Sequence, residues 1–405
     1  MVRESARRWL PLAACLALVG CYPHGDQLRR GDADAPPVAA APCVPVPFVL
    51  TPGDVLRMSV SGNGLGAALE GEARGQKDSA CATCRPGRKQ AKLAAELQGH
   101  ASDEIKNQTA ALALTAYFRL AEARVQSSLL RQAVAPIDTL AAQVAELRRQ
   151  GLPVPDDSDK LPQQRNRLEA DRVKLDLLQS GLVEQLHQVV GKAACLPPCS
   201  CSTITTIEVF HVEELAIDEA EAVAIGLKFR SDLNLLRSAL CNLEPGTLPV
   251  IRQVMLGLSS LLAGPARRCI PILECVPLLL PGLSSKEVEK VSKQLQMVLD
   301  ERKRQTISEI RQAVRTIHAQ QDSIRLARER ETMAQRKLDE AEENARVKRG
   351  KPAAVPLARQ DLLKARGEVI HEVIEWEIAR VNLRKAQGLL VRDGVEKARE
   401  ACAAE

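Results

Sequence analysis

The chain has 405 residues, of which 45% are hydrophobic, 26% are charged and only 2% are aromatic. A chain of this length would ordinarily hold about two or three compact domains with aromatic anchors, and two Trp, two Tyr and four Phe cannot supply them. The core must instead come from Leu, Val, Ile and Ala, a composition typical of long helices that pack against one another. A sheet-rich enzyme is therefore disfavoured.

The charge pattern argues against a nucleic-acid partner. The 56 Lys and Arg residues against 51 Asp and Glu residues give a net charge of +5. The two signs are interspersed along the chain and form no basic footprint, which is typical of solvated helix surfaces.

Residues 1–20 have the pattern of an export signal. Three arginines, Arg3, Arg7 and Arg8, precede the apolar run Trp9–Val19. A run of about eleven residues is too short to cross a bilayer as a helix. It is followed by a segment that resembles the bacterial lipobox, in which the final Cys is acylated and becomes the new N-terminus: Leu18, Val19, Gly20 and Cys21.

The residue after Cys21 is Tyr22 and not Asp, which by resemblance to the sorting rule of diderm bacteria directs a lipoprotein to the outer membrane. We therefore predict Cys21 as the lipid attachment site of an outer-membrane lipoprotein that faces the periplasm, since two or more acyl chains anchor a protein firmly. The alternative is an ordinary signal peptide, or an unprocessed apolar start, with a chance cysteine.

Twelve cysteines need an explanation in an oxidising compartment. Cys15 leaves with the signal, while Cys81 and Cys84, and then Cys195, Cys199 and Cys201, have spacings that invite a zinc interpretation. Because no His pair completes a ligand set, local disulfides or free thiols are favoured, with Cys241, Cys269 and Cys275 as further candidates for pairing. We predict no metal site and no cofactor.

The first half of the mature chain is predicted as a tether followed by a helical hairpin. Residues 21–98 are weakly patterned, rich in Pro, Ala and Gly, and are predicted as a weakly structured tether. From about Asp103, apolar residues recur at helical spacing within the first hairpin, residues 99–192. Pro136 should kink its first helix. A stop signal at Gly151, Leu152 and Pro153 separates that helix from a second one that begins near Gln163.

Residues 193–282 are predicted as a connector with short helices and a Pro-rich apolar segment. Its most apolar part, Thr247–Gly282, is interrupted by prolines and arginines and makes a poor membrane helix.

The second hairpin is predicted over residues 283–391, ahead of a C-terminal tail at 392–405. Its first helix has no Gly or Pro from Leu283 to Arg349, and Gly350, Lys351 and Pro352 then form its turn. The return helix carries two apolar stripes, one formed by Leu362, Ala365, Val369, Trp376, Ala379, Leu383, Ala386 and Leu390, the other by Leu363, Ile370, Ile374 and Val381. A helix with two such stripes contacts neighbours on both sides, as in a ring of helices.

No catalytic constellation accompanies these helices. His318 and His371 have no paired nucleophile or ligand set and are interpreted as surface or seam residues. The protein is predicted not to be an enzyme.

Three segments carry a resemblance to a family: Ala116–Ala123, Phe229–Leu233 and the closing pattern Ala379, Leu383, Ala386 and Gly388. With the tandem hairpins, they look like the TolC-type outer-membrane efflux proteins over residues 100–192 and 215–390. That family usually has Arg-Pro-Asp-Leu at the middle junction, where this chain has Ser231 in place of Pro.

The resemblance implies a homotrimer whose helical hairpins form a periplasmic α-barrel. It also implies that the hairpin tips, here Gly151-Leu152-Pro153 and Gly350-Lys351-Pro352, meet a periplasmic adaptor joined to an inner-membrane pump. The family adds short outer-membrane strands, but this sequence lacks alternating strands with aromatic girdles. The predicted fold is therefore mainly all-α, with two tandem long antiparallel hairpins and little or no β-barrel.

The predicted function is that of a passive efflux or export conduit, whose pump partner selects the cargo. The alternative is a non-conducting periplasmic structural or adaptor lipoprotein built on the same helical scaffold.

Overall fold

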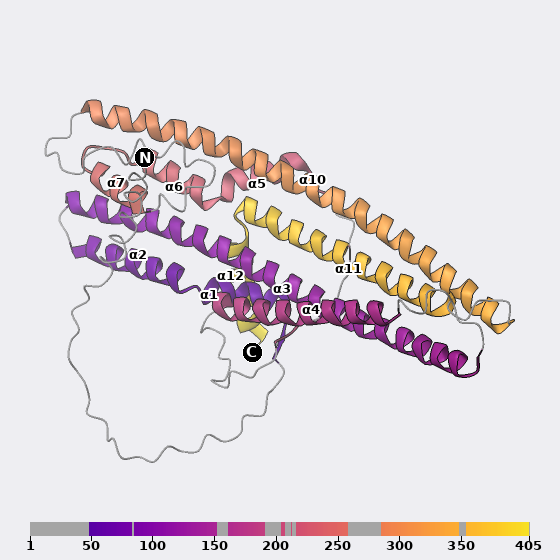
Figure 1. The fold of residues 1–405 in the computed structure, drawn as a ribbon. Coiled ribbons are helices and arrows are strands. Elements are labelled where there is room, and N and C mark those ends of the chain that lie inside the picture. Colours follow the sequence, from indigo (N-terminus) through magenta and orange to yellow (C-terminus); the bar gives the residue numbers. More distant parts are fainter. Residues whose placement is uncertain are drawn as a thin grey trace, which may run out of the picture. The chain divides into compact units, whose positions relative to one another are not determined.

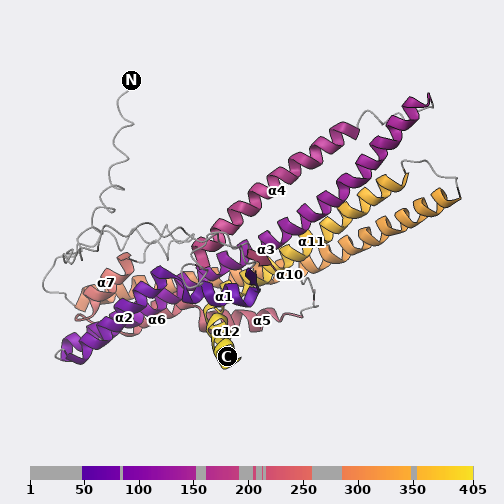
Figure 2. The same cartoon turned by 90° about the horizontal axis from the view of Figure 1, so that it is seen from below.

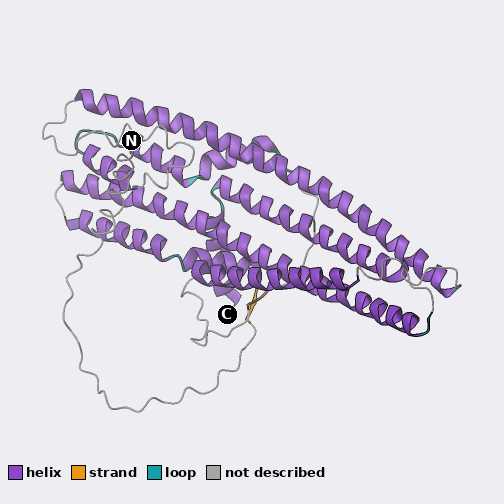
Figure 3. Cartoon of the chain, in the orientation of Figure 1, coloured by secondary structure: helices purple, strands orange, loops and turns teal. Residues whose placement is uncertain are grey.

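The structure is a computed structural model that describes residues 48–82, 85–151, 161–190, 204–206, 212, 216–257, 285–347 and 354–404. Contacts divide the chain into the units Met1–Val44 and Pro45–Glu405, and every described residue lies in the second. Helices dominate the described residues (Figure 3). Two strands of three residues, β1 (Phe48–Leu50) and β2 (Ile204–Thr206), form a parallel pair with Val49 opposite Thr205.

The first helical hairpin consists of α3 (Arg85–Arg149) and α4 (Leu161–Val190) (Figure 1). Asp138 of α3 forms an ion pair with Arg165 at 2.9 Å, and Gln179 donates to the Ala123 carbonyl at 3.1 Å. Because the partner number rises as the α3 number falls, the two helices are antiparallel. α3 continues through Pro136.

The second hairpin consists of α10 (Ser285–Arg346) and α11 (Ala354–Gln387). Antiparallel ion pairs join Arg330 to Glu368 at 3.4 Å and Glu342 to Arg359 at 3.1 Å. Its main core contains Ile310, Val314, Ile317 and Ile324 of α10, and Val373, Trp376, Ala379, Leu383 and Ala386 of α11. The two tandem hairpins predicted from the sequence are thus confirmed.

The four long helices are arranged in the order α4, α3, α11, α10. Contacts join α4 to α3, α3 to α11 and α11 to α10, and Figure 2 shows this order. The two stripes of α11 explain it: Trp376 and Leu383 pack in the core shared with α10, whereas Val381 packs with Tyr117 and Leu120 of α3. The expectation that α11 contacts neighbours on both sides is confirmed.

Shorter helices pack against the hairpins. They are α1 (Pro52–Ser61), α2 (Gly64–Ala82), α5 (Glu219–Phe229), α6 (Ser231–Cys241), α7 (Leu248–Gly257) and α12 (Leu390–Ala404). α1 and α2 contact α3, α5 contacts α10 and α11, and α12 contacts α1. α1 begins with a capping box in which Thr51 Oγ1 accepts from the Asp54 amide at 3.1 Å.

Two parts of the predicted organisation are wrong. Residues 52–82 and 85–98 of the expected tether are helical, so that Asp103 lies inside α3 and does not start it, and the expected tail is helix α12. Glycines weaken the intrinsic helix signal of this region, but Val55, Leu97 and Leu390 are buried. Tertiary packing therefore stabilises helices that local pattern does not predict. Most of the Pro-rich segment within 193–282 lies outside the described residues.

Candidate functional site

Of the predicted hairpin-tip residues, the structure describes Gly151. Gly151 follows the end of α3 with a left-handed φ of 68°, and its amide donates to the Arg148 carbonyl at 3.1 Å. This conformation suits Gly and closes the helix. Leu152, Pro153, Gly350, Lys351 and Pro352 lie outside the described residues, between the helices of each hairpin.

Other predicted sites also lie outside the described residues. Leu18, Val19, Gly20 and Cys21 are among them, as are Cys84, Cys195, Cys199, Cys201, Cys269 and Cys275. The thiol of Cys241 is free and exposed. Among the described residues, no group of His, Cys, Asp and Glu side chains is arranged to hold a metal ion. None of the described helices combines the length and apolarity needed to cross a bilayer.

One open groove lies between the two hairpins. It has a volume of about 960 Å³ and is lined by residues of α3, α4 and α11, with Arg330 of α10 at its edge. Leu129, Leu168 and Leu363 supply apolar walls, and Asp171 and Lys364 are among its charged residues. A groove with apolar walls and charged edges is suited to a protein partner more than to a small ligand.

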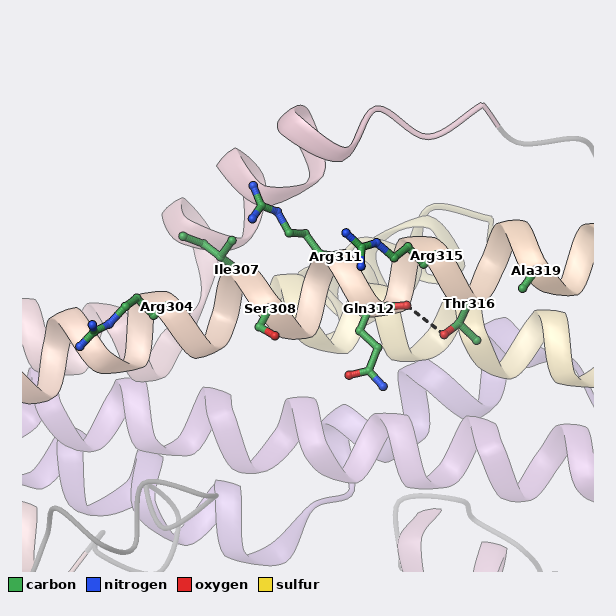
Figure 4. Close-up of a pocket in the computed structure, with 8 residues that line it drawn as sticks. All are labelled: Arg304, Ile307, Ser308, Arg311, Gln312, Arg315, Thr316 and Ala319. Carbon is green, nitrogen blue, oxygen red and sulfur yellow. Dashed lines mark hydrogen bonds between the residues drawn. The ribbon is translucent and has the colours of Figure 1, made fainter.

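A second groove follows one face of α10 (Figure 4). Its volume is about 840 Å³, and its lining side chains recur every three or four residues, so they share a helix face. Arg304 pairs with Glu301 at 2.8 Å, and Arg311 pairs with Glu219 of α5 at 2.9 Å. Arg304, Arg311 and Arg315 thus form a solvent-exposed row of arginines on this face of α10.

A belt of buried polar residues on α3 is the feature that sequence reasoning missed. Ser102, Glu104, Lys106 and Asn107 are all buried within a helix that elsewhere packs through Leu and Ala. Toward α2, Ser102 donates to the Gly66 carbonyl at 2.8 Å, and Lys106 pairs with Glu70. Toward α11, the Asn107 amide donates to the Lys385 carbonyl at 2.9 Å. Buried polar groups with specific partners fix one register between helices.

The polar belt meets a buried ion cluster at the junction between α5 and α6. Arg230 contacts both carboxylate oxygens of Asp232, at 3.0 and 3.1 Å, and also pairs with Glu309 of α10. Arg302 of α10 reaches the same Asp232 at 2.6 Å. Asp232 is 2% exposed, so loss of a guanidinium group would leave a buried charge poorly compensated, which is costly.

Glu104 of α3 faces this cluster. Burial, together with the negative charge of Asp232, raises the pKa of Glu104 to about 7, while Arg230, Gln108 and Arg302 act in the opposite direction. The signal available in the sequence was the junction Arg230–Leu233 itself, which indicated a family likeness but not its partners on α3 and α10.

A second polar contact joins α3 to α11. Glu122 accepts from Arg119 at 2.9 Å and lies 2.7 Å from His371 Nδ1, and Arg119 also pairs with Glu375. His371 therefore lies at a helix seam, and His318 is exposed. Both histidines occupy the places expected of them.

Comparisons with known proteins place this architecture. No known family model matches the sequence, and no curated protein matches it either. Solved structures do match, 23 chains in all.

Three outer-membrane channels represent these structures. For OprN the identity is 12%, the TM-score 0.61 and the coverage 83% of this chain and 89% of that one. For CmeC of Campylobacter jejuni the identity is 12%, the TM-score 0.59 and the coverage 83% of this chain and 85% of that one. For VceC of Vibrio cholerae the identity is 13%, the TM-score 0.57 and the coverage 83% of this chain and 96% of that one. The chain therefore has the fold of the TolC-type outer-membrane channels, as its sequence resemblance implied.

Proposed function

We propose that the protein is a subunit of a passive outer-membrane efflux or export conduit of the TolC type. The observation that carries the proposal is the layer of long helices in the order α4, α3, α11, α10, in which, among the described residues, each edge helix packs along one other long helix. Its fold matches that of outer-membrane channels over 83% of the chain.

Both edges of the layer expose apolar side chains. On α4, Val173 and Leu177 lie one turn apart, and Leu177 is 74% exposed. On α10, Leu326 and Met333 lie two turns apart on one face, and Met333 is 53% exposed. Exposed apolar stripes of this kind mark protein contacts.

The two edges differ from each other, so contact between copies is head-to-tail. If α4 of one copy packs on α10 of the next, such heterologous contacts close into a ring of helices. We infer a homotrimeric ring by resemblance to the TolC-type proteins. The space inside it would be water-filled, and cargo would pass without chemistry on the protein.

The partners of the conduit follow from its ends. The turns at residues 151–153 and 350–352 would face a periplasmic adaptor, which links the conduit to an inner-membrane pump. Lipid on Cys21 would hold the other end at the outer membrane of a diderm bacterium. The pump would supply the driving force and select the cargo.

The proposal is tested on purified, full-length, lipidated protein. We expect the mass of the detergent-solubilised complex to equal three chains and expect stepwise single-channel currents in planar bilayers. A monomer without conductance would contradict the conduit and would favour the non-conducting periplasmic scaffold. A trimer without conductance would support the ring but leave the protein with a structural or adaptor role.

A further inference from the structure

Glu104 on α3 is a buried carboxylate with one oxygen left unpartnered. Its Oε1 accepts from the Gln108 side chain at 2.8 Å, whereas its Oε2 has no hydrogen-bond partner among the described residues. The residue is only 8% exposed. An ionised carboxylate oxygen that is buried without a donor is costly, so this position favours a bound proton.

Glu104 is one of the residues that line a cavity of about 290 Å³ where four elements meet. Glu104 comes from α3, Arg230 from the α5–α6 junction, Glu309 and Thr316 from α10, and Asn382 from α11. The cavity therefore lies between the first hairpin and the second half of the chain.

Among the described residues, Glu104 forms no ion pair with a Lys or Arg side chain. Arg230 is held by Asp232 and Glu309, and Arg302 is held by Asp232. Three carboxylates thus share two guanidinium groups. On its own helix, Lys106 is turned to Glu70.

The remaining charge at the cavity is the exposed Lys385 of α11. Its ammonium group opposes the entry of another cation. A proton is consequently the species best suited to neutralise Glu104.

We propose that Glu104 is a proton-binding site that controls how firmly α3 of the first hairpin is held to α10, α11 and the α5–α6 junction. With the proton bound, the cluster is balanced and the elements pack closely. When the proton leaves, Glu104 repels Asp232 and Glu309, and the contact loosens. This regulation goes beyond conduction and can be tested without it.

The pKa of Glu104 places the change near neutrality. Burial and Asp232 raise it from 4.5 to about 7 in the folded protein. The folded state then binds more protons than the unfolded state between these values. The stabilising contribution is complete below about pH 4.5 and is lost as the pH rises through about 7.

Two nearby segments report the state of this contact. Asn107 lies less than a turn from Glu104 and donates to the Lys385 carbonyl at 2.9 Å. Gly388, just beyond α11, lies against the Arg230 backbone, where an added Cβ would be 2.9 Å from Arg230 Cα. Residues 102–109 and 382–388 should therefore become less protected together.

The experiment is amide hydrogen exchange on the full chain at about pH 5.5 and about pH 8, with rates corrected for intrinsic exchange. We expect exchange in residues 102–109 and 382–388 of the wild type to be several-fold faster at the higher pH. Glu104→Gln, which mimics the neutral acid, should abolish that difference. Glu340→Gln, at an exposed position of α10, is the matched control and should behave as wild type.

Either of two results would overturn the proposal: pH-independent protection in the wild type, or full pH dependence in Glu104→Gln. If Glu104→Gln does not fold, the melting temperatures of the wild type and of Glu340→Gln, measured against pH, test the proposal instead. Both melting temperatures should fall by the same amount as the pH rises through about 7. A melting temperature that stays constant or rises over this range would refute the proton site.

Discussion

At the residue scale, Gly388 and Arg230 fix the junction between the end of α11 and the start of α6. Gly388 has a φ of 72°, a left-handed conformation that L side chains rarely adopt. Its Cα hydrogen faces the Arg230 backbone with no room for a methyl group. The absence of a side chain at Gly388 thus allows the Arg230 backbone to pack against the end of α11.

We predict that Gly388→Ala is destabilising, because it combines backbone strain with a clash against main-chain atoms that cannot move aside. The loss should be at least about 1–3 kcal/mol, measured by thermal or denaturant unfolding. The matched control is Gly181→Ala in α4, where an added Cβ has no neighbour within 4 Å. That change should stabilise the helix by about 0.5–1 kcal/mol, and equal effects of the two substitutions would contradict the argument.

Arg230→Met should cost more than any surface charge removal, because it leaves Asp232 and Glu309 with only one of the two guanidinium groups that they share, that of Arg302. Removing one partner of a buried ion pair typically costs about 3–5 kcal/mol. The exposed pair of Lys293 with Glu289 is the comparison, and Lys293→Met should cost less than about 1 kcal/mol. Denaturant unfolding of both variants measures the difference. Similar losses would show that the cluster contributes no more than a surface pair.

At the element scale, the edge helices α4 and α10 both carry exposed apolar side chains in the single chain. Leu182 and Leu186 of α4 pack with residues of α1 and α3 in one core, while Val173, Leu177 and Leu178 are exposed. The same helix therefore has one satisfied face and one exposed apolar face. An element with such a second face stabilises an assembly more than its own chain.

Leu177→Glu should prevent assembly and leave the subunit folded. The side chain is exposed in one chain, so the charge costs little there, but it would be buried against α10 of a neighbour. We expect an unchanged helical circular dichroism spectrum and a monomer mass in detergent. Glu184→Gln, an exposed change on the same helix, should preserve the oligomer. A Leu177→Glu variant that still assembles would place the interface elsewhere.

At the scale of the whole molecule, the two halves of the chain each contain one long helical hairpin, but the contacts at the junctions of their short helices differ. In the first half, Asn63 donates to Thr109 at 2.7 Å, a neutral contact. In the second half, the corresponding junction between α5 and α6 holds the Arg230 cluster, which Glu104 of α3 faces. The central helix α3 contacts both, so changes in charge at one junction can alter how the hairpins sit together.

The proposed lipid anchor belongs to this scale because it would set where the proposed assembly is held. Cys21→Ala should abolish palmitate labelling of the protein in cells and release the chain from the membrane fraction, since the acylated residue is gone. Cys241→Ala, at the exposed free thiol, should keep both labelling and membrane association. Labelling that persists in Cys21→Ala would show that the lipobox assignment is wrong.

The sequence by itself determined the helical class, the two hairpins and the two apolar stripes of α11. These features depend on local periodicity and on Gly and Pro breakers, which act over one or two turns of chain. It did not predict α1, α2 or the early start of α3, because Gly-rich segments there fold only through burial against distant residues.

The tertiary structure alone decided the polar belt of α3 and the ion cluster around Asp232. Glu104 and Arg302 look like ordinary solvated charges on helices, and their meeting depends on contacts between residues far apart in sequence. Burial then changes their chemistry: the same carboxyl group that would ionise near pH 4.5 in an exposed helix keeps its proton to about pH 7 here. The local sequence pattern specified the helices, whereas tertiary packing specified which charged side chains are buried together away from water.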